Sequence, residues 1–259
     1  MSNQLINLLP KIKRARDFYL YDDEGNRILD LYLDKGRALS GHRPNGLSLA
    51  IKNSIARGLY APYPSIYSGR LIKLLKQEFP EFKQWEIYKS VESFAHSYQG
   101  KLDLEDPVFI GNSSKQKIWR QYIAVEENCE LLVINFPFPG SDVIAVLSKE
   151  TIILPESDLI STFILSALIR SFYDLKNRIE HSNNEKWSVL DETSHWTRRG
   201  PYLIPTCREE DYEQLFKLYL DNGILISPEF GIPSICAVDI KEGTLKKLFK
   251  CIKENVSGK

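Results

Sequence analysis

The stretch LLVINFPFPG, residues 131–140, carries the signal that decides the fold class. Its run of aliphatic residues predicts a buried strand, and a Pro-Phe-Pro-Gly turn comes after Asn135 and Phe136. In open α/β sheets, ligands bind beyond the carboxyl ends of such strands. The sequence therefore delivers an amide and a phenyl ring to a place where an enzyme usually carries acids.

The segments around this strand predict an alternation of helices and strands. Residues 115–128 have a helical pattern, DVIAVL at 142–147 predicts a second short buried strand, and 158–178 predicts a long apolar helix capped by Ser157 or Asp158. Further helices are expected at 46–57, 68–79, 209–221 and 244–254, with strands at YLIP, ILIS and SICAVDI and a polar linker at 181–187. This alternation indicates the α/β class.

The clearest local signal outside this centre is FYLYDDEGNRILDLYL, residues 18–33. Aromatic and aliphatic residues alternate with polar ones on both sides of a D-D-E-G-N turn, which predicts a β-hairpin. Gly25 or Asn26 can supply the positive φ of that turn. A loop ending in His42-Arg43-Pro44 follows, and this pair either binds an anion or supports the hairpin.

Composition excludes several classes of protein. The 259 residues carry 34 basic and 34 acidic side chains, so net charge gives no reason to expect nucleic acid or an anionic membrane surface. The four cysteines are scattered, without zinc spacing or a disulfide framework. The first residues lack a signal-peptide core, and no run has the length of a membrane span. We expect a cytoplasmic protein.

Both ends of the chain resemble one known family. ARDFYLYDDEGNRILDLYLDKGRALSGHRPNGLSLAI (15–51), GLYAPYPSIYSGRLIKLLKQEFPEF (58–82) and YEQLFKLYLDNGILISPEFGIPSICAVDI (212–240) are similar to segments of the class III aminotransferases. These are fold-type I pyridoxal-phosphate enzymes and include glutamate-1-semialdehyde aminomutase. The resemblance implies a small α+β domain from both chain ends, residues 1–40 and 198–259. Between them, residues 41–197 would form a reduced large domain with a mainly parallel sheet.

The resemblance also implies four cofactor-binding devices, and two of them depart from the family pattern. The phosphate loop is expected after EFPEFKQWEIY, but KSVESFAHSYQG follows, with Val91 or Ser93 where a glycine is needed. Asn135 occupies the place of the acid that pairs with the pyridine nitrogen, and an amide cannot supply that charge. The expected grip on pyridoxal phosphate is therefore weak or absent.

The remaining candidates keep some of the family pattern. Tyr98 and Gly100 match the Y-H-G segment, whose aromatic ring stacks on the cofactor, with Gln99 in place of histidine. On that alternative alignment the phosphate loop and its helix are deleted from the chain. Lys149 is the candidate Schiff-base lysine, although its spacing is one residue too long, and otherwise it is a solvated lysine at a strand end. Thr162 matches the threonine that reaches the phosphate of the partner subunit, or else is a buried helix residue.

These residues leave three functions open. The chain is a non-catalytic family member with a binding or structural role, an active aminotransferase or aminomutase using Lys149, or a protein that binds a small ligand in a vestigial cleft. The resemblance further implies a homodimer, for which the aromatic stretch 58–69 is the expected contact. Thr193-Ser194-His195, followed by Arg198-Arg199, is taken as a solvated polar segment.

Overall fold

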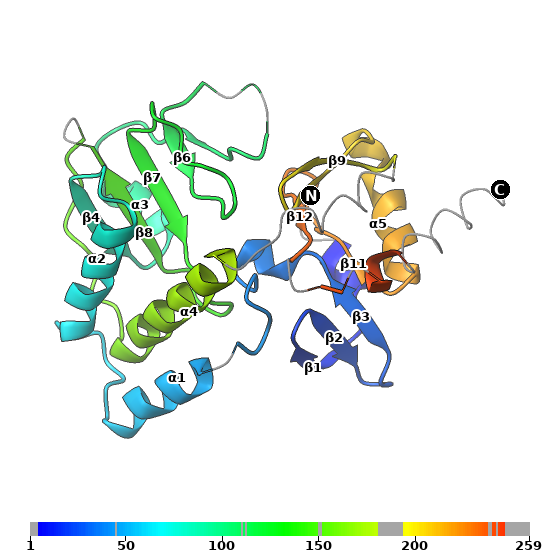
Figure 1. Ribbon diagram of the computed structural model, residues 1–259, viewed down its shortest axis with the longest axis horizontal. Helices are drawn as coiled ribbons and strands as arrows, with labels where there is room; N and C mark the ends of the chain where they lie inside the picture. Colours follow the sequence, from blue (N-terminus) through cyan, green and yellow to red (C-terminus); the bar gives the residue numbers. More distant parts are fainter. Residues whose placement is uncertain are drawn as a thin grey trace. The chain divides into compact units, whose positions relative to one another are not determined.

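The computed structural model of the protein describes residues 5–44, 46–109, 111, 113–149, 152–180, 194–237, 240–241 and 243–246. The chain divides into two compact units. One combines Met1–Arg43 with Glu180–Lys259 and is called the terminal unit, and the other is Pro44–Ile179 and is called the central unit. Figure 1 follows both units along the chain.

The central unit contains a five-stranded sheet in the order β4-β8-β7-β6-β5. Its strands are β4 (Gln84–Tyr88), β5 (Leu104–Glu105), β6 (Gln116–Ile118), β7 (Leu131–Asn135) and β8 (Ile144–Ser148). β8 pairs antiparallel with both β4 and β7, whereas β7, β6 and β5 pair in parallel. Four strands therefore run in one direction and β8 in the other, which is the mainly parallel sheet expected.

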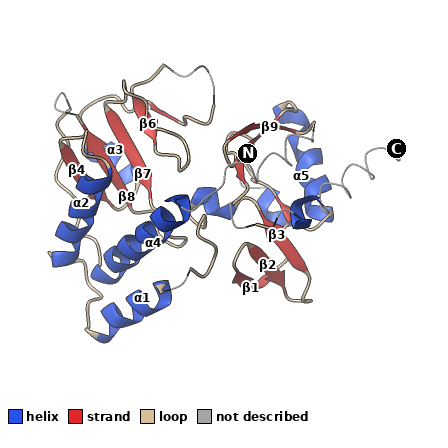
Figure 2. Cartoon of the chain, viewed as in Figure 1, coloured by secondary structure: helices blue, strands red, loops and turns tan. Residues whose placement is uncertain are grey.

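Helices cover both faces of this sheet. α2 (Ile66–Glu78) and α4 (Thr162–Glu180) pack on one face, and the shorter α3 (Val91–Ser97) packs on the other. Helix α1 (Leu47–Ala56) is joined to α4 by a hydrogen bond between the Ser54 and Ser166 hydroxyl groups (2.8 Å). Figure 2 shows the helices and strands of the unit by colour.

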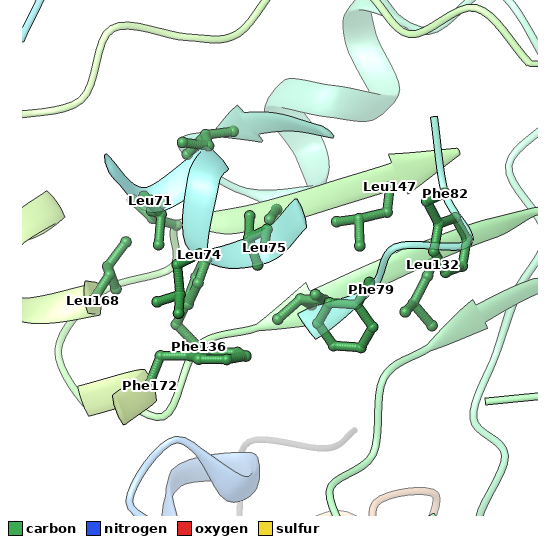
Figure 3. Packing of buried hydrophobic residues seen from close by; sticks show 14 of the residues in the cluster. Leu71, Leu74, Leu75, Phe79, Phe82, Leu132, Phe136, Leu147, Leu168 and Phe172 are labelled. Atoms are coloured by element: carbon green, nitrogen blue, oxygen red, sulfur yellow. The ribbon is translucent and has the colours of Figure 1, made fainter. Parts of the chain in front are cut away.

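The core on the α2 and α4 face explains why these helices form where the apolar spacing predicted them. Leucines of α2 meet alternate residues of β7 and β8, because side chains of a strand point to opposite faces in turn. Phe136 and Phe172 close the cluster, with ring centroids 6.2 Å apart. Figure 3 shows these side chains pointing toward one another.

The helix expected at 115–128 is wrong. Residues 116–118 form β6, which pairs in parallel with β7, and turns follow as far as Cys129. Trp119 continues the ladder by donating its N–H to the carbonyl of Val133 (2.7 Å). Pairing with a central strand therefore overrides the local helical pattern.

The terminal unit contains two small sheets and the helix α5, and residues 243–246 are also helical. Its elements are β1 (Ile12–Arg16), β2 (Tyr19–Asp22), β3 (Arg27–Asp30), β9 (Trp196–Arg199), β10 (Tyr202–Pro205), α5 (Tyr212–Asp221), β11 (Ile224–Leu225) and β12 (Ser234–Ile235), with 3-10 turns at Leu5–Leu8, Leu33–Gly36 and Glu209–Asp211. The sheet orders are β1-β2-β3-β11 and β12-β10-β9. The predicted hairpin is β2–β3, with Gly25 at φ +93°. Residues 181–187 and most of 244–254 lie outside the described residues.

Candidate functional site

Asn135 lies at the carboxyl end of β7, paired with Ile144 at the start of β8. It is partly exposed, whereas Phe136 is buried in the core beside α4. Strand alternation places Asn135 on the face of Leu131 and Val133, which is the face that α3 covers. The amide therefore stands at the edge where ligands of such sheets bind.

The turn between β4 and α3 lies at the same edge, since β4 runs in the same direction as β7. Here one of the two alignments with the family places the phosphate loop, and the other has the loop deleted. The backbone N–H of Lys89 donates to the Asp158 carboxylate (2.9 Å), and so does the Ser93 hydroxyl (2.5 Å). The Ser93 N–H is taken by the Ser90 hydroxyl, which caps α3.

A second carboxylate belongs to this turn. Hydrogen bonding to the Ser90 side chain lowers the pKa of Glu92, and its own backbone N–H adds to the effect. The charge of Asp142, just before β8, acts in the opposite direction and shows that a further acid is near. Two donors that could meet a phosphate, the Lys89 N–H and the Ser93 hydroxyl, are thus engaged by Asp158, and Glu92 and Asp142 are further acids near this turn.

Asp158 and Ser157 are not helix caps, which corrects the expected start of the long helix. Ser157 accepts from the N–H of Ile87 (2.9 Å), and the Asp158 N–H donates to the carbonyl of the same residue (2.9 Å). Both residues therefore hold their segment along the outer edge of β4. Helix α4 begins only at Thr162, which is buried and about 3% exposed.

The structure does not bring Lys149 to Asn135. Because β8 is antiparallel to β7, Lys149 emerges beside the amino end of β7, where its N–H donates to the Glu130 carbonyl (2.9 Å). Its ammonium group donates to the carbonyl of Glu127 (2.7 Å) and lies 5.9 Å from the Phe82 ring centre. Asn135 is at the other end of the strand and on the other face.

Tyr98 lies at the end of α3, and its ring stacks on Phe94 at 4.9 Å. It lines an open pocket together with Gly100 and the segment Ile152–Pro155. The four residues proposed from the sequence are therefore spread over the central unit. Asn135 and the turn before α3 share the carboxyl edge of the sheet, and Lys149 does not.

Two polar groups of the terminal unit have structural partners. His42 Nε2 lies 2.8 Å from a carboxylate oxygen of Asp30 in the hairpin, which favours the supporting role over anion binding. His195 was expected in a solvated segment, but it is half-buried, and its Nδ1 lies 3.1 Å from the Tyr219 hydroxyl. Thr193 lies outside the described residues.

Metal clusters and membrane-spanning helices are both absent from the described part of the chain. It holds no group of three or more His, Cys, Asp or Glu side chains arranged for a metal ion. Among the same residues, no helix combines the length and the apolar character needed to cross a membrane.

Comparison with known proteins places this fold. A solved ornithine aminotransferase of Plasmodium yoelii superimposes with a TM-score of 0.70 at 11% identity, covering 96% of this chain and 93% of that chain. An acetylornithine aminotransferase of Elizabethkingia anophelis gives 0.67 at 13% identity, covering 100% and 99%. The fold is that of the class III aminotransferases, as the sequence resemblance indicated.

Sequence comparison gives the family. No family model matches the chain. An uncharacterized protein of Borreliella burgdorferi is 30% identical over 251 residues, which covers 95% of this chain and 91% of that protein, and the chain belongs to one family with it. A glutamate-1-semialdehyde 2,1-aminomutase of Heliobacterium modesticaldum is 38% identical over 155 residues, covering 57% of this chain and 34% of that enzyme.

Proposed function

We propose that this chain is a non-catalytic protein of aminotransferase fold, with a binding or structural role in the cytoplasm. The observation that carries the proposal is the turn before α3, where the Asp158 carboxylate accepts from the Lys89 N–H and the Ser93 hydroxyl. A phosphate at this turn would lose those donors and meet the negative charges of Asp158 and Glu92. Like charges repel, so the turn does not fit the phosphate of pyridoxal phosphate.

The amide of Asn135 supports the same proposal. An acid in its place would pair with the pyridine nitrogen and hold it protonated, whereas an amide has no ionisable group. Lys149 adds a third argument, because it lies at the opposite end of β7 from Asn135. The separation of Lys149 from Asn135 argues against a shared cofactor site, and we derive no reaction step through the cofactor.

Incubation with pyridoxal phosphate tests the proposal. We expect calorimetry to show weak binding. We also expect the wild type to show no visible absorption band from a cofactor bound to Lys149, so that Lys149→Ala leaves the spectrum unchanged. Surface lysines react with free aldehydes, so Lys83→Ala, at an exposed position, is the control for unspecific modification. Tight stoichiometric binding with a band lost only in Lys149→Ala would support the alternative, an active aminotransferase or aminomutase.

The proposal includes a homodimer. Tyr60, Tyr63 and Ile66 lie between α1 and the first turn of α2 and are 57%, 73% and 70% exposed. Leu49 of α1 is 62% exposed. Large apolar and aromatic side chains are enriched in the cores of interfaces, which favours a second copy of the chain as the partner of this segment.

A further inference from the structure

The pocket beside Tyr98 is a second candidate site, at the C-terminal end of α3 and not at the turn before that helix. Its volume is about 430 Å³, and its walls are Ser97–Gly100 at the end of α3 and Ile152–Pro155 beside β4. Pockets that hold small molecules commonly have about 300–1,000 Å³. The space is therefore sufficient for a small molecule and does not depend on whether the chain has lost pyridoxal-phosphate chemistry.

Both walls of the pocket are fixed to β4. The rings of Tyr88, Phe94 and Tyr98 form a ladder with centroids 4.9 Å apart at each step. A β-carbon on Gly100 would lie 2.5 Å from the Tyr98 ring, so only glycine allows the ring to lie this close to the backbone. The Tyr98 ring therefore lies against Phe94 on one side and the backbone of Gly100 on the other.

The opposite wall is held by hydrogen bonds to the same strand. The Gln84 amide donates to the Ile152 carbonyl (2.7 Å) and accepts from the Leu154 N–H (3.0 Å). The Tyr88 hydroxyl donates to the carbonyl of Pro155 (2.6 Å). A pocket with two fixed walls loses little conformational freedom on binding, which favours affinity.

The side chains that line the pocket indicate which class of ligand it would bind. No Lys, Arg, His, Asp or Glu is among the lining residues that the structure describes. Ile152 and Leu154 make one wall apolar, with the exposed Ile153 between them. Ser97, Tyr98 and Gln99 carry hydroxyl and amide groups whose side chains make no hydrogen bond to any other described residue. We propose that this pocket binds an uncharged small molecule that combines an aromatic or aliphatic body with hydrogen-bonding groups, such as an aromatic amide.

Nicotinamide is a suitable neutral probe, and nicotinate is its anionic counterpart of the same shape. Titration of the isotope-labelled full chain is expected to shift the amide signals of residues 97–100 and 152–155 with nicotinamide, and at least about tenfold more weakly with nicotinate, because an unpaired charge loses hydration in an apolar site. Ile153 is 84% exposed, so Ile153→Glu leaves the core intact while placing a charge in the pocket. We expect it to weaken nicotinamide binding, because it replaces an apolar side chain of the lining with a charged one.

Two further variants separate the pocket from unspecific contact. Tyr98→Phe removes one hydroxyl and is expected to weaken binding a few-fold. Tyr63→Phe, at an exposed tyrosine outside the pocket, is expected to bind like the wild type. The proposal is overturned if nicotinamide shifts no signal of the pocket at millimolar concentration, if nicotinate binds equally well, or if Ile153→Glu binds unchanged.

Discussion

At the scale of single residues, Asn135 is the simplest change to reverse. We expect Asn135→Asp to give no measurable transaminase activity, because it restores one group while the carboxylates of Asp158 and Glu92 still engage the turn before α3. Groups that act as a unit contribute non-additively, so one repaired member recovers little. An amino-donor assay with added pyridoxal phosphate, run beside the wild type and Asn135→Ser, measures this.

Turnover by Asn135→Asp and not by Asn135→Ser would contradict the proposal that catalysis is lost. It would also require a phosphate grip elsewhere in the chain, because Lys89 and Ser93 donate to Asp158. Adding Asp158→Asn to the Asn135→Asp variant and measuring turnover again would then show whether the Asp158 carboxylate opposes cofactor binding.

His195 is the residue whose environment predicts a dependence of stability on pH. Burial lowers its pKa, because the half-buried ring loses hydration that favours the charged form. Above about pH 6.5, the ordinary histidine value, the ring is neutral in both the folded and the unfolded chain. As pH falls below this value the unfolded chain binds the proton first, so the free energy of unfolding decreases until the lowered folded pKa is passed.

Urea unfolding between about pH 5 and pH 8 measures the effect, with pH values chosen around the ordinary histidine pKa. His195→Gln is expected to lose part of the decrease seen in the wild type on the acid side. His96→Gln, at an exposed position of α3, is the matched control. An unchanged pH profile in His195→Gln would show that the half-buried ring does not resist protonation.

At the scale of elements, two glycines of the central unit give opposite predictions from backbone conformation alone. A β-carbon at Gly69 in α2 or at Gly58 after α1 would meet no atom within 4 Å, but Gly58 has φ +74°. Gly69→Ala is expected to stabilise by about 0.5–1 kcal/mol through helix propensity. Gly58→Ala is expected to destabilise by about 1–2 kcal/mol, since the left-handed region disfavours a side chain.

Denaturant unfolding of the two alanine variants checks this pair. Both glycines are exposed and have free space for a β-carbon. Changes of opposite sign in the free energy of unfolding would therefore reflect backbone conformation alone. Equal shifts in the two midpoints would contradict the assigned left-handed turn at Gly58 or the helical position of Gly69.

Elements with a strong local pattern were predictable from the sequence. The strand at 131–136, the helix with Leu71, Leu74 and Leu75 on one face and the hairpin at Gly25 are all confirmed. The segment at 115–128 was not, because three residues of β6 owe their conformation to the ladder with β7. Such pairing is a property of the folded sheet and leaves little trace in local periodicity.

The position of Lys149 could have been predicted from the short connection between the two strands before it, which the comparison with the lysine motif did not consider. Only residues 136–143 separate β7 from β8. A parallel crossover needs about a dozen residues or more, so two adjacent strands this close in sequence pair antiparallel. The lysine at the end of the second strand must then emerge beside the start of the first, far from Asn135.

At the scale of the whole molecule, the chain keeps a family fold in two compact units while the groups proposed for cofactor chemistry are dispersed. A fold does not imply a function, because function depends on the groups that a site brings together. The central unit keeps the sheet and the strand ends, and Asp158 engages the Lys89 N–H and the Ser93 hydroxyl at the turn before α3. The segment from Leu59 to Tyr67 exposes the large side chains of Tyr60, Tyr63 and Ile66, and a partner surface would explain their exposure.

We expect this segment to join two copies of the chain. Sedimentation equilibrium at micromolar concentration should give twice the 29.9 kDa of one chain for the wild type. Tyr63→Asp combined with Ile66→Asp should give a monomer, because both side chains are largely exposed in one copy and a charge in an interface core is costly. Ile153→Asp, at another exposed apolar position of the central unit, should remain dimeric. A wild-type monomer would refute the dimer, and a dimer that survives the double substitution would place the contact elsewhere.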